Sequence, residues 1–238
     1  NNLSNHLAAG VFSDCETLKS VTISDKVYSI GISTFQNCLA LENIEIPASV
    51  EVIYDAAFAG CASLVDISFL GAPEKICTKA FYYCGSLMEV ELPAGVEILG
   101  DNVFSDCENL TRVTLPDSIS EMGNSMFAND KKLIYARLSS SLLRLPKQTF
   151  YCCESLNSIE IPEGIKSIDE MSFRGCSSLR SISLPKSLAV VESNAFSDTY
   201  VLSEVKYGGN DAQFYSIAFN SGNLPLVSAY MNAKGAEE

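Results

Sequence analysis

The clearest pattern in the chain is a phenylalanine that recurs with a constant 23-residue period. The series comprises Phe12, Phe35, Phe58, Phe81, Phe104, Phe127, Phe150, Phe173, Phe196 and Phe219. A cysteine usually follows three residues after the Phe, and in nine successive repeats, from Leu18 to Leu202, a leucine follows six residues after it. A fixed period of this length predicts a repeat architecture in which every unit adopts the same structure.

Each repeat also carries the pattern of a short strand. Apolar residues nine and eleven positions after the Phe flank a polar one, as Ile44 and Ile46 flank Glu45. This alternation is the period of a half-buried β-strand. Proline then often follows, as at Pro47, and because proline cannot donate to a strand ladder it marks the strand end. A V-x-x-I segment, ending eighteen residues after the Phe, returns the chain across the other side of the coil.

A single coil of this length cannot bury its own apolar side, whereas stacked coils can. The sequence therefore predicts a predominantly β solenoid of about nine coils, with the strands in one parallel sheet and with short turns or 3₁₀ segments between them. We expect a single domain. Residues 1–206 form the repeat array, with an incomplete first coil, and residues 207–238 form a terminal unit with a polar tail.

The repeat resembles a known family. Its L-x-x-L-x-L core is similar to leucine-rich repeats, which are α/β-type solenoids. The fuller template, A-F-x-x-C-x-x-L-x-x-I-x-I-P-x-x-V-x-x-I, resembles the BspA-like subclass, most closely in "AFAGCASLVDIS" and "SFRGCSSLRSISLPKSLAVVESNAF". The tail resembles the terminal unit of such arrays through Tyr207, Gly208, Gly209, Phe214, Ile217, Gly222, Asn223 and Leu224. Phe214 stands where the family usually has Trp.

This resemblance implies a bacterial protein that is secreted or attached to the cell surface. The implied role is non-catalytic adhesion, with a protein or glycan ligand on host or neighbouring cells bound through the sheet face. A structural spacer within a larger surface protein, without a ligand of its own, is the alternative. The full-length gene product would distinguish the two, because an anchor or further modules would favour a spacer or an adhesin over a free-standing binder.

Composition narrows the range of partners. The chain has 238 residues and a formal net charge of -13, from 16 basic and 29 acidic side chains. A nucleic-acid partner is not expected, because phosphate binding needs clustered Lys and Arg. No apolar run reaches the length of about 20 residues that crosses a bilayer, so we expect no membrane insertion by this segment. We expect a monomer.

The nine cysteines are candidates for chemistry, but their pattern favours packing. Seven of them occupy the position three residues after the Phe, where Asp130 and Thr199 also occur. A column of one Cys per coil forms a line rather than the tetrahedral group that a metal needs. Neighbouring thiols in such a ladder point in parallel, which disfavours disulfides. We therefore expect buried free thiols, with Cys152, which lies off the column, as the best candidate for an exposed one.

The sequence offers little for catalysis. His6 is the only histidine, and one imidazole cannot serve as the base for seven equivalent cysteines. No phosphate-binding, nucleophile-elbow or metalloprotease motif is present. We therefore expect no enzyme activity, no catalytic residue, no metal site and no cofactor. Calcium at an acidic patch is the weaker alternative, since the spacing of a calcium loop is absent.

The outward-facing positions of the strands, eight and ten residues after each Phe, form two adjacent columns on the predicted sheet. The candidate ligand-binding face consists of Asn43, Glu45, Asp66, Glu89, Glu91, Arg112, Tyr135, Arg137 and Glu160. It contains an acidic part followed by a basic part with one aromatic ring, and Arg and Tyr are enriched at binding hot spots. A solvated face whose charges only maintain solubility is the alternative interpretation.

The repeat that begins at Phe127 departs most from the template. It has Asp130 in place of Cys, Ala136 in place of Ile or Val, and Ser139 in place of Pro. This coil also supplies Tyr135 and Arg137 to the candidate face. It is thus a candidate functional locus, with ordinary sequence drift as the alternative.

Overall fold

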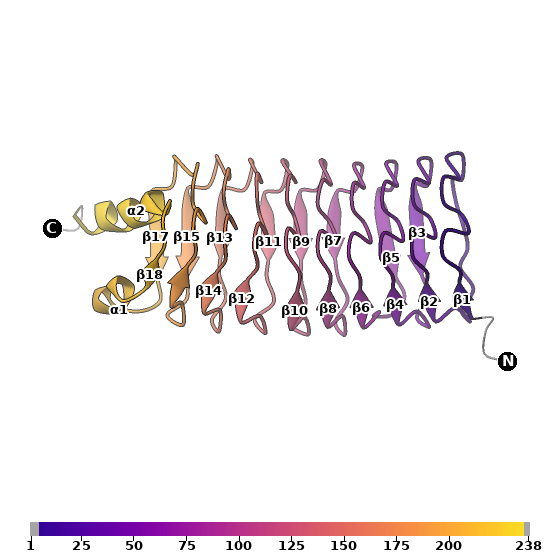
Figure 1. Ribbon diagram of the computed structural model, residues 1–238, viewed down its shortest axis with the longest axis horizontal. Helices are drawn as coiled ribbons and strands as arrows, with labels where there is room; N and C mark the ends of the chain where they lie inside the picture. Colours follow the sequence, from indigo (N-terminus) through magenta and orange to yellow (C-terminus); the bar gives the residue numbers. More distant parts are fainter. Residues whose placement is uncertain (1–4, 236–238) are drawn as a thin grey trace.

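The structure, a computed structural model, describes residues 5–235. Residues 1–4 and 236–238, at the ends of the two predicted ranges, lie outside the described residues. The chain forms a rod of stacked coils, with two helices at the C-terminal end (Figure 1). Strands of successive coils pair in parallel, and each residue lies beside its equivalent in the next repeat, as Ile44 does beside Ile67. The predicted solenoid and its period are therefore confirmed.

One side of the rod, here called the front face, carries the strands predicted from the alternating pattern. They are β3 (Asn43–Ile46), β5 (Asp66–Phe69), β7 (Glu89–Glu91), β9 (Arg112–Thr114), β11 (Tyr135–Arg137), β13 (Ser158–Glu160), β15 (Ser181–Leu184) and β17 (Glu204–Tyr207). Their central apolar residues point inward and the flanking polar residues outward, because consecutive strand residues face opposite sides. Residues 20–23 of the first coil form no strand.

The opposite side, the back face, carries two-residue strands from the V-x-x-I segments. They are β1 (His6–Leu7), β2 (Ser29–Ile30), β4 (Val52–Ile53), β6 (Lys75–Ile76), β8 (Ile98–Leu99), β10 (Glu121–Met122), β12 (Arg144–Leu145), β14 (Ser167–Ile168), β16 (Val190–Val191) and β18 (Ala218–Phe219). The prediction of one parallel sheet is therefore wrong, because the back-face strands pair in a ladder of their own. The return segments repeat in the same register as the front strands and also pair.

Both ladders are interrupted. On the front face no strand pairing joins β5 to β7 or β11 to β13, and on the back face none joins β10 to β12. The coil of Phe127 contributes both β11 and β12, so it lies beside one gap on each face. The irregular repeat of the sequence is thus also the irregular part of the stack.

The core lies between the faces and is built from columns of identical residues. The rings from Phe12 to Phe196 form a continuous stack, with neighbouring centroids 5.0–6.2 Å apart. Apart from Cys15 and Leu18 in the first described coil, the cysteine and leucine columns are buried beside it. Each Phe sits on a tight turn closed by successive bonds between residues three apart, as Cys38 N–H donates to the Phe35 carbonyl and Leu41 N–H to that of Cys38.

All nine cysteines are free thiols, as predicted, and seven are buried. The expectation for Cys152 is wrong in part, because this residue is only partly accessible and Cys15 is the exposed one. Cys15 belongs to the first described coil, so no described coil precedes it in the column. Cys152 is in the left-handed conformation on its turn, and its Sγ lies against Gly175 of the next coil.

The C-terminal end is closed by α1 (Asp211–Tyr215) and α2 (Leu224–Gly235). Phe214 of α1 is fully buried and stacks on Tyr230 of α2, with centroids 3.6 Å apart. The side chain of Asn223 takes the place that backbone groups of the following coil have elsewhere in the array. Its Oδ1 accepts the Phe196 N–H and its Nδ2 donates to the Glu192 carbonyl. The terminal unit therefore acts as a cap of the array.

Two residues of this end lie elsewhere than their spacing predicted. Phe219 continues the phenylalanine series in sequence, but in the structure it lies in β18 and pairs with Val191. Phe214, predicted to occupy the position eighteen after the preceding Phe, lies instead in α1. The insertion of α1 lengthens the last coil between Val191 and its partner Phe219, which shifts both residues out of register.

Candidate functional site

All nine residues of the predicted face lie on front-face strands and are exposed. Asn43 and Glu45 come from β3, Asp66 from β5, Glu89 and Glu91 from β7, Arg112 from β9, Tyr135 and Arg137 from β11, and Glu160 from β13. The strand register places Asn43 beside Asp66, and it places Arg112 between Glu89 and Tyr135. The predicted columns are therefore real neighbours in space. Their role in binding stays a prediction.

The charges of the array are distributed unevenly along the rod. Residues 1–130 carry five basic and 18 acidic side chains, whereas residues 131–238 carry eleven of each. Among the described residues, every ion pair between side chains lies at Asp117 or beyond it. Glu45, Asp66, Glu89 and Glu91 consequently lie in a half of the molecule whose negative charge is uncompensated.

The basic part of the face contains a fixed aromatic ring. The guanidinium carbon of Arg112 lies 4.2 Å from the ring centroid of Tyr135, in the geometry of a cation–π contact. The strand register makes this contact possible, because the two residues are direct partners across β9 and β11. The Tyr135 ring is thus supported on one side, while 41% of the residue remains exposed.

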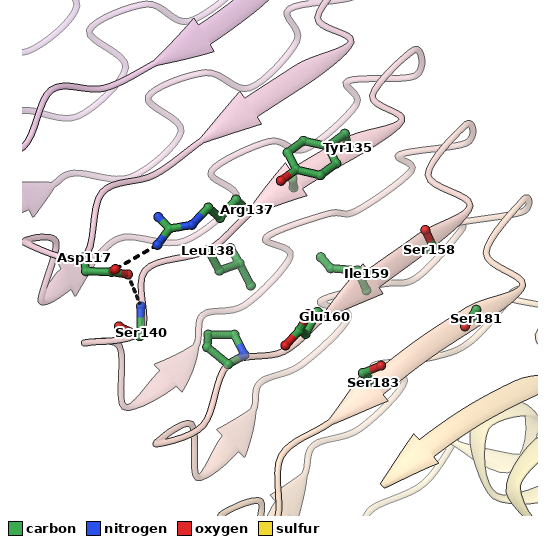
Figure 2. A pocket seen from close by; sticks show the side chains of 12 residues that line it. Asp117, Tyr135, Arg137, Leu138, Ser140, Ser158, Ile159, Glu160, Ser181 and Ser183 are labelled. Atoms are coloured by element: carbon green, nitrogen blue, oxygen red, sulfur yellow. Dashed lines mark hydrogen bonds and ion pairs between the residues drawn. The ribbon is translucent and has the colours of Figure 1, made fainter. Parts of the chain in front are cut away.

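Next to it, Arg137 forms a clamp with the preceding coil, called here the Asp117 clamp (Figure 2). Its Nη2 lies 2.8 Å from Asp117 Oδ2 and its Nη1 donates to the Leu115 carbonyl at 2.6 Å. The Ser140 backbone N–H donates to Asp117 Oδ1 at 2.9 Å. The Ser140 N–H and then the Arg137 guanidinium lower the pKa of Asp117, since both favour its charged form.

The clamp explains the gap between β11 and β13. Ser139 Oγ donates to the Ile119 carbonyl and Ser141 Oγ to the Asp117 carbonyl, each at 2.6 Å, so the loop after β11 is tied toward β9. At the position of Ser141, Ser187 donates to the Ile165 carbonyl of its preceding coil. Gly164 occupies this position in the coil of β13 and has no side chain to make such a bond. The loop after β11 is thus bonded to the preceding coil, whereas the position of Gly164 adds no such bond from the following coil.

The result is a groove of about 560 Å³ on the front face, running over β11, β13 and β15. One wall consists of Tyr135, Arg137 and Ser140, and the floor and far wall consist of Ser158, Glu160, Ser181 and Ser183 (Figure 2). The lining offers hydroxyl groups, one aromatic ring and the carboxylate of Glu160, which makes no ion pair with a described residue.

The groove contains hydroxyl groups but no histidine. Its serines have no imidazole beside them, since His6 lies in β1 at the opposite end of the rod, where its Nδ1 is 2.7 Å from Ser29 Oγ. Within residues 5–235, no three His, Cys, Asp or Glu side chains converge on a point where a metal ion could bind. Neither described helix has the length and apolarity needed to cross a membrane.

Sequence reasoning identified three of the groove residues, namely Tyr135, Arg137 and Glu160, but missed the partners that shape it. Asp117 lies in the loop after Pro116 and gave no strand signal. The replacement of proline by Ser139, which frees the loop to bond backward, was the available signal.

The stacked parallel coils and the capped end define a leucine-rich repeat solenoid. The family model of the BspA type leucine rich repeat region matches residues 5–134 and 98–225, in six copies. The chain therefore belongs to the BspA-type leucine-rich repeat family. A comparison with curated proteins finds no match.

Several solved structures are similar. A leucine rich cell surface protein from Faecalibacterium prausnitzii is 25% identical, over 93% of this chain and 81% of that one, with a TM-score of 0.47. The T. pallidum leucine rich repeat protein is 25% identical, over 80% and 75%, with a TM-score of 0.52. The pneumococcal vaccine antigen PcpA is 22% identical, over 79% and 59%, with a TM-score of 0.50.

Proposed function

We propose that this protein is a non-catalytic interaction module that binds a partner protein on its front face, with the groove between β11 and β13 at the centre of the contact. The observation that carries the proposal is the combination of a groove and an exposed aromatic ring held in place by Arg112. A pre-positioned ring loses little conformational freedom on binding, so more of its contact energy appears as affinity.

The composition of the groove supports a protein ligand. Tyrosine and arginine dominate binding hot spots, and serine hydroxyls adapt their hydrogen bonds to different partners. Arg137 and Asp117 neutralise each other, which leaves Glu160 as the charge available to a ligand. A partner with a basic side chain opposite Glu160 would complement this groove.

We further propose that the partner lies outside the cell, on a host or neighbouring cell. Membership of the BspA-type family and the role that the family resemblance implies support this placement. The uncompensated negative charge of residues 1–130 disfavours contact of this half of the rod with an anionic cell surface. The rod would therefore approach such a surface with its C-terminal half, which contains most of the groove.

Photo-crosslinking from two positions of the same coil tests the proposal. A benzophenone amino acid replaces Ser158 in the groove, or Lys166, which is exposed beside β14 on the back face, as the matched control. Both proteins are irradiated on intact host or bacterial cells. A discrete protein adduct from position 158 alone is expected. Equal adducts from both positions, or none from either as for a spacer, would overturn the proposal.

The captured partner is then titrated against variants. Tyr135→Ala should weaken binding at least tenfold, because loss of a central aromatic anchor costs about 2 kcal/mol or more. Lys166→Ala should bind like the unmodified protein. Unchanged binding by Tyr135→Ala would exclude the groove as the site. Loss of binding after enzymatic removal of glycans from the partner would overturn the assignment of a protein ligand in favour of a glycan.

A further inference from the structure

The cysteine column carries a second, less visible ladder. In six coils the Sγ atom lies 3.1–3.4 Å from the carbonyl oxygen of the Phe in the preceding coil. The donors are Cys38, Cys61, Cys84, Cys107, Cys153 and Cys176. A thiol is a weak hydrogen-bond donor, so each coil is linked to the one before it through S–H···O=C contacts.

Asp130 occupies this column in the coil of Phe127 and is fully buried. Its Oδ1 accepts the backbone N–H of Cys107 at 2.8 Å. Its Oδ2 is the one buried side-chain oxygen or nitrogen among the described residues that has no hydrogen-bond partner. The thiols of Cys107 and Cys153 contact the carbonyls of Phe81 and Phe127, so the equivalent carbonyl for the group at this position is that of Phe104.

We infer that Asp130 is a neutral carboxylic acid in the folded protein, and that its Oδ2 proton is donated to the Phe104 carbonyl as the thiols of the other coils donate to theirs. Asp130 then links the coil of Phe127 to the preceding coil by two hydrogen bonds, one accepted and one donated. An ionised Asp130 would lose the donated bond and leave an unpaired charge in the core.

Among the described residues, no basic side chain acts on the Asp130 carboxyl to compensate such a charge. The titratable groups around Asp130 are the thiols of Cys107 and Cys153, on the coils before and after it, and the carboxylate of Asp106. The neighbouring Lys131 is exposed and pairs with Glu154 at 3.9 Å. Burial, followed by the charge of Asp106, raises the pKa of Asp130 well above its usual range, while the Cys107 N–H acts in the opposite direction.

The same junction departs from the regular stacking of the core and of the back face, although hydrogen bonds join its front strands. The Phe104 and Phe127 rings are 6.2 Å apart, the widest step of the stack, and β10 and β12 do not pair. A groove of about 480 Å³, lined by Met122, Leu143 and Arg144 among others, opens there on the back face. The protonated carboxyl therefore adds a pH-dependent link between two coils whose back-face strands do not pair and whose rings are furthest apart.

The direction of the pH effect follows from linkage. The unfolded chain loses this proton near pH 3.8, whereas the folded chain keeps it to higher pH. The stabilising contribution is thus fully present below 3.8 and is lost as the pH rises toward the folded-state value. Over that interval the unfolding equilibrium constant increases by about tenfold per pH unit for this one group.

The test compares urea unfolding of the full chain from about pH 5 to about pH 8 with that of Asp130→Asn. Asparagine can accept from Cys107 and donate to Phe104 without titrating. The unfolding constant of the unmodified protein divided by that of Asp130→Asn should rise with pH, by about tenfold per pH unit until the pH reaches the folded-state pKa of Asp130. Glu108→Gln, which removes an exposed carboxyl from the same junction, is the matched control, and the ratio for Asp130→Asn should rise more steeply than the ratio for this variant. A constant ratio for Asp130→Asn would refute the inference.

Two further measurements keep the inference testable if Asp130→Asn folds poorly. Asp130→Cys restores the residue used by the other coils and should remove the pH dependence in the same way. The infrared spectrum of the unmodified protein at about pH 7 should contain the carbonyl band of a protonated carboxylic acid, and Asp130→Cys should lack it. Absence of that band from the unmodified protein would overturn the proposal.

Discussion

The Sγ atom of Cys84 lies 3.3 Å from the carbonyl oxygen of Phe58 in the preceding coil. The thiol therefore serves as a small apolar filler and also as a donor between coils. This dual role explains why other hydrogen-bonding residues occur in the column. Thr199 donates to the Phe196 carbonyl within its own coil at 2.7 Å, and Asp130 bonds to Cys107.

Cys84→Ala should destabilise the array by about 1–2 kcal/mol, because it removes the donor and leaves a small cavity in a fully buried column. For a chain of this size the loss corresponds to a decrease in Tm of roughly 2–8 °C. Differential scanning calorimetry checks it. The control, Cys15→Ala, alters an exposed thiol and should change stability by less than about 0.5 kcal/mol. Equal effects would contradict a structural role of the column.

Thiol alkylation should divide the cysteines into two classes. Burial raises the pKa of Cys38 to about 11 and that of Cys61 to about 12, which leaves little thiolate at neutral pH. In the native protein, iodoacetamide should modify the exposed Cys15 first and the partly accessible Cys152 more slowly. The seven buried thiols should react only after denaturation. Peptide mass spectrometry after short pulses measures this order, and rapid native labelling of Cys61 would refute it.

Phe104→Ala should cost about 3–5 kcal/mol, because the ring is fully buried between those of Phe81 and Phe127. The surrounding coils are held by their own hydrogen bonds and cannot close the cavity completely. Thermal unfolding measures the loss. Leu143→Ala is the matched control, since this side chain is 64% exposed and should be nearly neutral. A near-neutral effect of Phe104→Ala would show that the stack is not the core.

The Asp117 clamp should be visible in a pH titration. The pKa of Asp117 is lowered, mainly by the Ser140 N–H and then by Arg137, so the contribution of this carboxylate is present above 3.8 and is lost as the pH falls through its folded-state value. The amide chemical shift of Ser140 should therefore titrate with a midpoint below 3.8. Two-dimensional NMR measures it. In Arg137→Gln the midpoint should move upward, and an unchanged midpoint would mean that the clamp is not formed.

Much of the fold was predictable because a repeat reports the same environment many times. The positions of Phe35, Leu41 and Ile44 recur in successive coils, and a residue that recurs at the same phase must face the same way. The exposure of the nine candidate face residues follows from strand alternation alone. The errors arose where the period fails, at Phe214 and Phe219, because the inserted α1 changes the register without changing the spacing in the sequence.

The sequence by itself determined the solenoid, its period, the buried columns and the outward face of the strands, since these depend only on local periodicity and on the burial of apolar residues. The tertiary structure decided where neighbouring coils separate. The groove exists because Asp117 holds Arg137 and Ser140 while Gly164 offers no equivalent bond. The environment of Asp130 depends likewise on backbone groups of the preceding coil, such as the Cys107 N–H. Such contacts join side chains to groups of different coils, and their geometry appears only when the coils are stacked.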